Sequence, residues 1–217
     1  MKYIKPINEF WGDVLKRDLL GETREEDKFH SKKELREYLK SEIKRQGKNV
    51  VIQGIDVSLI EDLSDLFVDI ADRVKTLDLS GWKTSNVKNM SYMFYCCARL
   101  ESLNLSGWDT SSVKTMNGMF YHCESLESLD LSGWDVSKVE NMAWMFSCCR
   151  KIKSIDVSDW DTSKVNNMGY MFYKCAKLES LDLSRWDTSS VMDETDMFAG
   201  CPAPYEIVDC EIVRKGN

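Results

Sequence analysis

Residues 108–133, WDTSSVKTMNGMFYHCESLESLDLSG, are one copy of a pattern that recurs through most of the chain at a step of 26 residues. A tryptophan, a Met-Phe pair and a cysteine keep this step in five copies. A fixed period of this length is typical of solenoids, in which each repeat is one structural unit stacked on its neighbours. The recurring residues are Trp82, Trp108, Trp134, Trp160 and Trp186; the pairs that begin at Met93, Met119, Met145, Met171 and Met197; and Cys97, Cys123, Cys149, Cys175 and Cys201.

Each repeat has two halves with different hydrophobic periods. Residues 126–133 end in an apolar–polar alternation, which predicts a short strand with Leu129 and Leu131 inward. The apolar residues between Val113 and Cys123 step by three, three, one and three, which predicts a short helix with one buried face. The sequence therefore predicts an α/β repeat solenoid: a leucine-rich-repeat-like, right-handed coil with a parallel strand ladder on one side and short helices on the other.

A capping helix is predicted ahead of the repeats. Ser31 and Glu34 have the S-x-x-E spacing of a capping box, in which the serine accepts from an early backbone N–H and the glutamate accepts from the cap's own N–H. Gly47 is expected to end this helix, because glycine tolerates positive φ. The apolar stripe that would cover the open end of the solenoid is Leu35, Tyr38, Leu39 and Ile43.

The repeats begin before the first recurring tryptophan. Residues 56–67 align without gaps to residues 109–120, with Ile60, Leu63, Leu66 and Phe67 in place of the later apolar side chains. The offset is 53 residues, two periods plus one, so one extra residue is expected between Phe67 and Leu77. We expect four segments: a charged appendage at 1–30, the capping helix at 31–47, about six turns at 48–201, and a C-terminal cap at 202–217 with a closing strand over 205–213.

Composition limits the classes of partner and the location. The formal net charge is −7, which disfavours nonspecific nucleic-acid binding because the phosphate backbone selects clustered Lys and Arg. No apolar run is long enough to insert in a membrane, and residues 1–18 do not have the pattern of a signal peptide. We expect a cytoplasmic or virion-associated protein, or a cell-surface protein if a signal was removed. The oligomeric state stays open.

The repeat motif, L-x-S-L-D-L-S-G-W-D-T-S-x-V-x-x-M-x-x-M-F-x-x-C, resembles the BspA-like leucine-rich repeats of bacterial surface proteins and Mycoplasma-type lipoproteins. The resemblance covers about residues 48–201 and implies an open, curved scaffold for protein binding or adhesion. Residues 4–18, IKPINEFWGDVLKRD, resemble N-terminal peptides carried by unrelated proteins of large gut bacteriophages. That likeness implies an address segment and a bacterial or phage origin.

Outward positions of a stack form columns, and two of them are acidic. Like charges one turn apart repel, so their recurrence needs an offset. Each aspartate could accept hydrogen bonds from flanking serines or backbone N–H groups, or the columns could form an anionic strip for a protein partner with a basic or neutral surface; a cation ladder is a third possibility. The candidate partner-binding face consists of Asp78, Asn104, Asp130, Asp156 and Asp182, with Ser102, Ser128 and Ser154, and of Asp109, Asp135 and Asp161.

The tryptophan column has two interpretations. Each ring could pack against the tryptophan of the next turn, or the rings could form an exposed strip for carbohydrate. The cysteine column is interpreted as buried thiols, although stacked positions lie within disulfide reach. No Cys-x-x-Cys spacing indicates a metal site, and no phosphate-binding loop appears.

Catalysis is not indicated, because the only histidines are His30 and His122 and every Ser and Asp of the motif recurs. We expect no cofactor, no metal and no enzymatic activity. The function predicted is a non-enzymatic protein-interaction scaffold. The alternatives are a structural or packaged component of a larger particle, addressed by its N-terminal segment, and a carbohydrate-binding adhesin.

Overall fold

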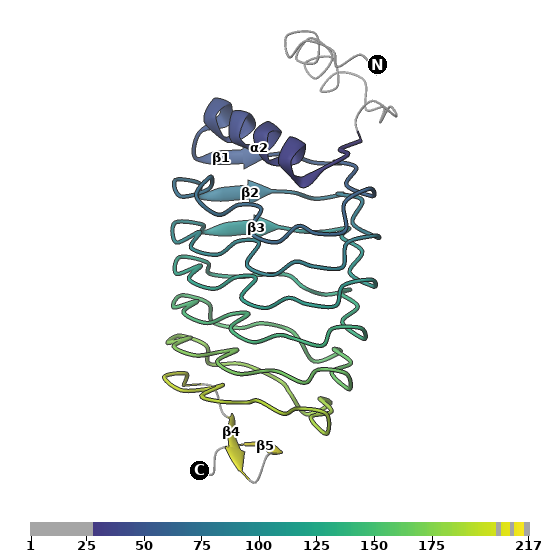
Figure 1. Ribbon diagram of the computed structural model, residues 1–217. Coiled ribbons are helices and arrows are strands. Elements are labelled where there is room, and N and C mark those ends of the chain that lie inside the picture. The colour runs from purple at the N-terminus through teal and green to yellow at the C-terminus, as the bar shows by residue number, and fades with distance from the viewer. Residues whose placement is uncertain (1–27, 203–204, 209–210, 215–217) are drawn as a thin grey trace.

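The computed structural model describes residues 28–202, 205–208 and 211–214. Figure 1 shows these residues as a series of stacked turns that follows one helix, α2 (Lys32–Gln46). The strands are β1 (Asn49–Val51), β2 (Thr76–Asp78), β3 (Ser102–Asn104), β4 (Tyr205–Val208) and β5 (Glu211–Arg214). The charged appendage predicted at residues 1–30 lies almost entirely outside the described residues.

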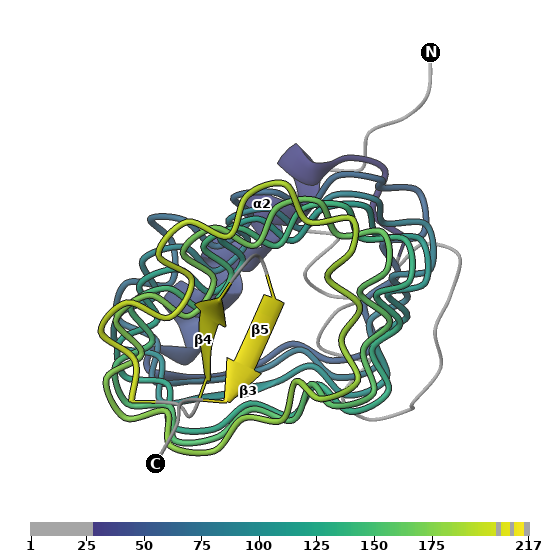
Figure 2. The ribbon, with the colours of Figure 1, turned by 90° about the horizontal axis from the view of Figure 1, so that it is seen from below.

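Strands β1, β2 and β3 form a parallel sheet with one strand from each of three successive turns. Val50 pairs with Leu77, a step of 27 residues, and Leu77 pairs with Leu103, a step of 26 residues. The difference confirms the extra residue predicted between Phe67 and Leu77. Figure 2, viewed along the stack, shows the turns superposed on one another, as this register requires.

A second ladder of parallel bridges joins the turns through the segment for which the sequence predicts short helices. Alternate N–H groups of this segment donate to the next turn: Phe120 N–H donates to the Met145 carbonyl at 2.9 Å, while Met119 N–H donates back to Met116 at 3.1 Å. An α-helix would need all these donors within the segment, so the segment forms consecutive turns, and α2 is the one α-helix of the described residues. The bridged column is Asp62, Asn89, Thr115, Asn141, Asn167 and Asp193.

The core is built from columns of like side chains. Phe94 stacks on Phe120 with ring centroids 5.6 Å apart, and Phe120 stacks on Phe146 at the same separation. A buried threonine adds a polar link between turns, because Thr84 Oγ1 donates to the Asp109 carbonyl at 2.8 Å and accepts from the Asp109 N–H at 2.9 Å. Repetition of these contacts gives one continuous apolar core through the stack.

Helix α2 begins and ends at the predicted residues. Ser31 Oγ accepts from Glu34 N–H at 3.2 Å, and the Gly47 N–H, at φ +82°, donates to the Ile43 carbonyl at 2.9 Å. One detail of the predicted capping box is wrong: the Glu34 carboxylate accepts from the N–H of His30, one residue before the cap. Leu35 and Leu39 are fully buried against the first turn, so the apolar stripe covers the end of the stack.

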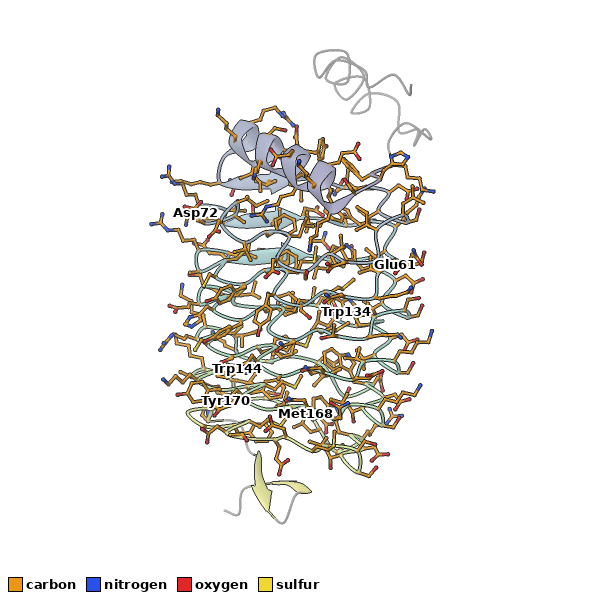
Figure 3. The ribbon with its side chains drawn as sticks, in the orientation of Figure 1. Glu61, Asp72, Trp134, Trp144, Met168 and Tyr170 are labelled. Atoms are coloured by element: carbon orange, nitrogen blue, oxygen red, sulfur yellow. The ribbon has the colours of Figure 1, made fainter. Side chains whose placement is uncertain are left out.

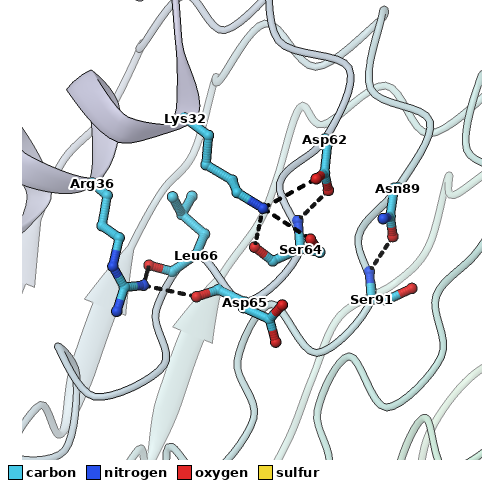
Figure 4. A network of polar contacts seen from close by, with 8 residues as sticks. All are labelled: Lys32, Arg36, Asp62, Ser64, Asp65, Leu66, Asn89 and Ser91. Carbon is cyan, nitrogen blue, oxygen red and sulfur yellow. Dashed lines mark hydrogen bonds and ion pairs between the residues drawn. The ribbon is translucent and has the colours of Figure 1, made fainter.

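Two basic side chains of α2 complete the hydrogen bonding of the first turn. In the bridged segment alternate carbonyls accept from N–H groups of the preceding turn, and the first turn has no predecessor there. Lys32 Nζ donates to the Ser64 carbonyl at 2.9 Å, and the Arg36 guanidinium donates to the carbonyls of Asp65, Leu66 and Val68 (Figure 4). The helix therefore supplies charged donors where a further turn would supply backbone N–H groups.

The C-terminal segment differs from the prediction of one closing strand. Strands β4 and β5 pair antiparallel, with Ile207 opposite Ile212 and Val208 opposite Glu211. Because two residues connect Val208 to Glu211, the chain reverses and forms a hairpin.

Replacement of Arg36 by methionine is expected to destabilise the protein by about 1–3 kcal/mol, because the part-buried carbonyls of Leu66 and Val68 lose their charged donor. Urea unfolding followed by circular dichroism measures this change. Arg73→Met is the control, since the Arg73 side chain is 83% exposed; equal losses in both variants would contradict the capping role.

Candidate functional site

The predicted aspartate columns lie at the corners that follow the strand positions, and each side chain closes a local turn. In both columns Oδ1 accepts from the backbone N–H two residues further on, at 2.9–3.2 Å; Asp130, for example, accepts from Ser132 at 3.0 Å, and Asp135 accepts from Ser137 at 2.9 Å. Asn104 makes the same bond to Ser106 with its amide oxygen. The hydrogen-bond interpretation of these columns is therefore confirmed, and it accounts for Asn as well as Asp.

The same bonds keep the columns negatively charged. Hydrogen bonds from Ser132 hold the pKa of Asp130 below its usual value, and bonds from Ser163 and Ser189 do the same for the pKa of Asp161 and Asp187. These side chains are exposed, so their charge faces solvent. The serines predicted for this face, Ser102, Ser128 and Ser154, are also exposed.

On the side of the stack that carries β1, β2 and β3, the backbone hydrogen bonds between successive turns are interrupted within the candidate partner-binding face. Leu79 N–H donates to the Asn104 carbonyl at 2.9 Å, and Gly81 N–H donates to the Ser106 carbonyl at 2.8 Å. One turn later, the equivalent N–H groups of Leu105 and Gly107 have no partner among the described residues.

A pocket of about 290 Å³, the inter-turn pocket, lies at this interruption. Asp130 and Ser132 line it, and their carbonyls accept no hydrogen bond in the described part of the chain. Trp108 and Trp134 also line it. The Trp108 indole N–H donates to the Leu79 carbonyl at 2.8 Å, whereas that of Trp134 has no partner in residues 28–202. The pocket thus brings together a carboxylate, unpaired backbone groups and two indole rings.

The recurring tryptophans are buried, so the exposed aromatic strip considered for carbohydrate is wrong for this column. Trp82, Trp108, Trp134 and Trp160 are at most 7% exposed, and Trp186 is partly buried. Trp82 stacks on Trp108 with ring centroids 5.7 Å apart. The indole column is part of the core, as the packing interpretation predicts.

A different set of rings is partly exposed, and the sequence analysis did not single it out. These rings come from the bridged segment and contact one another across four turns. Tyr95 stacks on Tyr121 at 5.3 Å, and Trp144 stacks on Tyr170 at 4.1 Å. Trp144 and Tyr170 are labelled on neighbouring turns in Figure 3. Tyr121 and Trp144 are also 5.3 Å apart. The signal in the sequence is an aromatic residue one position before or after the Met-Phe pair. We define the aromatic stripe as Tyr92, Tyr95, Tyr121, Trp144, Tyr170 and Tyr173.

Three rings of the stripe occupy a backbone position that favours glycine. Tyr92, Trp144 and Tyr170 have φ of +56°, +62° and +58°, and Gly118 has φ +60° at the equivalent position. A left-handed conformation costs a bulky residue roughly 1–2 kcal/mol, which glycine avoids. The Tyr92 ring fills the space above Gly118, where an added Cβ would lie 2.3 Å from Tyr92 Cε1.

The cysteine column consists of free, buried thiols. Cys123 Sγ donates to the Phe94 carbonyl and Cys149 Sγ donates to the Phe120 carbonyl, both at 3.2 Å. Burial raises the pKa of Cys97 to about 12 and that of Cys123 well above its usual value. Neutral thiols with raised pKa values are poor nucleophiles and poor metal ligands. In the described ranges no group of three or more His, Cys, Asp or Glu side chains could hold a metal ion.

Comparison with known families identifies the repeats. The family described as "Mycoplasma protein of unknown function, DUF285" matches residues 39–154 and again residues 125–205. The chain belongs to the DUF285 family. Its DUF285 repeats therefore include the last residues of α2, the strand-side columns and the aromatic stripe. No curated protein and no solved structure matches the chain. No helix within the described residues has the length and apolar character needed to cross a membrane.

Substitution of Gly118 by alanine is expected to destabilise the protein by more than the roughly 1–2 kcal/mol cost of its left-handed backbone, because the new methyl group meets the Tyr92 ring. Gly133→Ala is the matched control, since Gly133 also has positive φ but nothing lies within 4 Å of an added Cβ. Denaturant unfolding compares the two, and adding Tyr92→Ala should remove the difference. Equal destabilisation by the two alanines would contradict the packing of Tyr92 on Gly118.

Stability is expected to fall in acid as the aspartate columns become protonated. The pKa values of Asp130, Asp161 and Asp187 in the folded chain lie below the value of about 3.9 in the unfolded chain, because each carboxylate accepts hydrogen bonds from the serine two residues on. The stabilisation by these hydrogen-bonded carboxylates is therefore complete above the unfolded-chain pKa and is lost as pH falls through the pKa of the folded chain. The urea midpoint should be constant from about pH 7 to about pH 5 and fall below about pH 4. A variant with Asn at Asp130, Asp161 and Asp187 should lose less stability over the same pH range. A fall in its urea midpoint identical to that of the wild type would assign the acid sensitivity to other groups.

Proposed function

We propose that this chain is a non-enzymatic protein-interaction scaffold whose acidic columns bind a partner with a basic surface. The observation that carries the proposal is the inter-turn pocket between Asn104 and Asp130, in the middle of the candidate face. Outside the pocket, Asp135, Asp156 and Asp161 are exposed and accept the hydrogen bond of the turn through Oδ1, which leaves Oδ2 available to a partner's cation.

The pocket suits one side chain of a partner, a lysine or an arginine. The Asp130 carboxylate supplies the opposite charge, and the unpaired carbonyls of Asp130 and Ser132 are acceptors for the remaining N–H groups. Trp108 and Trp134 supply aromatic walls, which attract a cation through the ring quadrupole. A charged side chain with several donors would use all of these groups together.

We also propose that the stack is a leucine-rich-repeat-like solenoid of the BspA-like type, with right-handed turns. The repeat motif, the regular bridges between equivalent residues and the shared core columns support this assignment. A scaffold of this kind presents outward columns on a fixed core, and it binds through many equivalent positions rather than through one reactive group. Residues 1–27 lie outside the described residues, so the addressing role and the particle-component alternative stay predictions.

Replacement of Asp130, Asp156 and Asp182 by asparagine is expected to weaken partner binding at least tenfold without unfolding the protein. Asn104 holds the same position and closes the same turn, so asparagine removes the charge and keeps the hydrogen bond. Partners are captured on the immobilised full chain from the organism's own lysate, identified by mass spectrometry, and titrated against both proteins at two salt concentrations.

The matched control removes three charges elsewhere, from the last turn: Asp193→Asn, Glu194→Gln and Asp196→Asn. Asparagine already occupies the equivalents of Asp193 at Asn141 and Asn167, and it tolerates the φ of +49° at Asp196. The proposal is supported by a partner that binds the control and the wild type equally but binds the variant with asparagine at Asp130, Asp156 and Asp182 weakly. A partner that binds all three proteins equally rejects this face.

A further inference from the structure

We propose that the aromatic stripe and the cations beside it form a binding site for a linear anionic polysaccharide. This site is separate from the acidic columns, since its residues come from the bridged segment and the corner that follows it rather than from the strands. The proposal therefore goes beyond the protein-interaction function and does not depend on it.

Backbone strain indicates that the rings serve more than packing. The position of Tyr92, Trp144 and Tyr170 is left-handed in every turn, and Asp65, Gly118 and Asp196 show that small residues fit there. Large rings at a strained position are retained only where the surrounding structure or a function requires them. The core does not require them, because they lie outside its buried cluster and remain partly exposed.

The corner beside the stripe is basic on a protein of net charge −7. Lys174 Nζ lies 4.7 Å from the centroid of the Tyr173 ring, and Lys177 follows it; both are exposed, and neither has an ion-pair partner among the described residues. Two of the corner cations have carboxylate partners: Arg150 Nε lies 3.7 Å from Glu124, and Lys151 Nζ lies 3.9 Å from Glu127. The cations are Arg99, Arg150, Lys151, Lys174 and Lys177. Such a group attracts carboxylates or sulfates.

The arrangement of the rings selects among anionic polymers. Trp144 has Tyr170 stacked on it and Tyr121 tilted against it, so its faces are covered by neighbouring rings. A nucleic-acid base needs a free ring face on which to stack, and at Trp144, the largest ring of the stripe, neighbouring rings take that place. The phenol groups of the tyrosines remain for contact, and their hydroxyls suit hydrogen bonding to the hydroxyl groups of a sugar.

Repetition favours a polysaccharide over a folded protein. Tyr95, Tyr121 and Tyr173 recur at the turn spacing, and Trp144 contacts both Tyr121 and Tyr173 across the position of the smaller Ser147. A ligand that uses the whole stripe must offer similar groups at regular intervals along a line. A polymer of acidic sugars does so, whereas the side chains of a folded protein surface have no such period.

The test measures binding of the full chain to polygalacturonate, heparin, neutral dextran and a single-stranded oligothymidylate by titration calorimetry at low and moderate salt. We expect binding to one or both anionic polysaccharides, weakened by salt, and little binding to dextran or to the oligonucleotide. Failure to bind either anionic polysaccharide overturns the proposal. Tighter binding of the oligonucleotide than of both polysaccharides also overturns it and assigns the site to nucleic acid.

Two variants locate the site. Trp144→Gly with Tyr170→Gly removes two rings and relieves the backbone strain, so the fold is expected to survive, as circular dichroism and the melting temperature will report. Lys174→Ala with Lys177→Ala removes the unpaired cations. Each pair should weaken polysaccharide binding at least tenfold, while Lys138→Ala with Lys164→Ala, and Asp130→Asn, should leave it within about twofold. Unchanged binding in a folded Trp144→Gly/Tyr170→Gly variant rejects the stripe as the site.

Discussion

Hydrogen bonds between the backbones of successive turns are the interaction on which this structure depends. The hydrogen bonds within one repeat, such as that from the Met119 N–H to the Met116 carbonyl, close only tight turns, so they do not hold one turn against the next. The column from Asp62 to Asp193 is bridged at every step, and alternate N–H groups of the same segment donate to the following turn. This register places equivalent side chains one above another, and it gives the phenylalanine, methionine and cysteine columns a shared core.

The register also separates the residues that maintain the fold from those that can differ between turns. Inward positions keep one residue type, because each ring or thiol packs on its own equivalent. Outward positions need only fit the local backbone. The aspartates close turns through one oxygen and could be replaced by asparagine, while the left-handed position accepts Asp, Gly, Tyr or Trp at different cost. The acidic columns and the aromatic stripe are therefore two surfaces carried by one core.

The period and its inward columns could be predicted from the sequence, because burial selects one residue type at one step. The extra residue before Leu77, the limits of α2 and the packing of the tryptophans follow from the same pattern. The short helix predicted in each repeat, between Val113 and Cys123 for example, could not be excluded from the hydrophobic period alone. Apolar residues at steps of three and four indicate a helix in isolation, and only the neighbouring turns redirect every second N–H group.

Other features depend on contacts between turns that a single repeat does not contain. The capping role of Arg36 arises because the first turn has carbonyls without a preceding turn. The aromatic stripe was missed because its rings are divided between two positions around the Met-Phe pair, and neither position is aromatic in every turn. The inter-turn pocket arises where equivalent backbone groups fail to meet, and no residue type marks that place in the sequence.

The pocket has a mechanical consequence. At the level of Leu105 and Asp130 the turns are joined on the bridged side, where Thr115 pairs with Asn141. On the strand side the N–H groups of Leu105 and Gly107 have no partner among the described residues, and the Glu127 N–H reaches the Glu101 carbonyl at 3.5 Å. A stack whose turns are hydrogen-bonded along one edge and lack some of these bonds along the other is expected to bend by separation of the turns at the less bonded edge. Tension along the long axis is therefore expected to widen the gap at Trp108 and Trp134 before it separates the bridged edge.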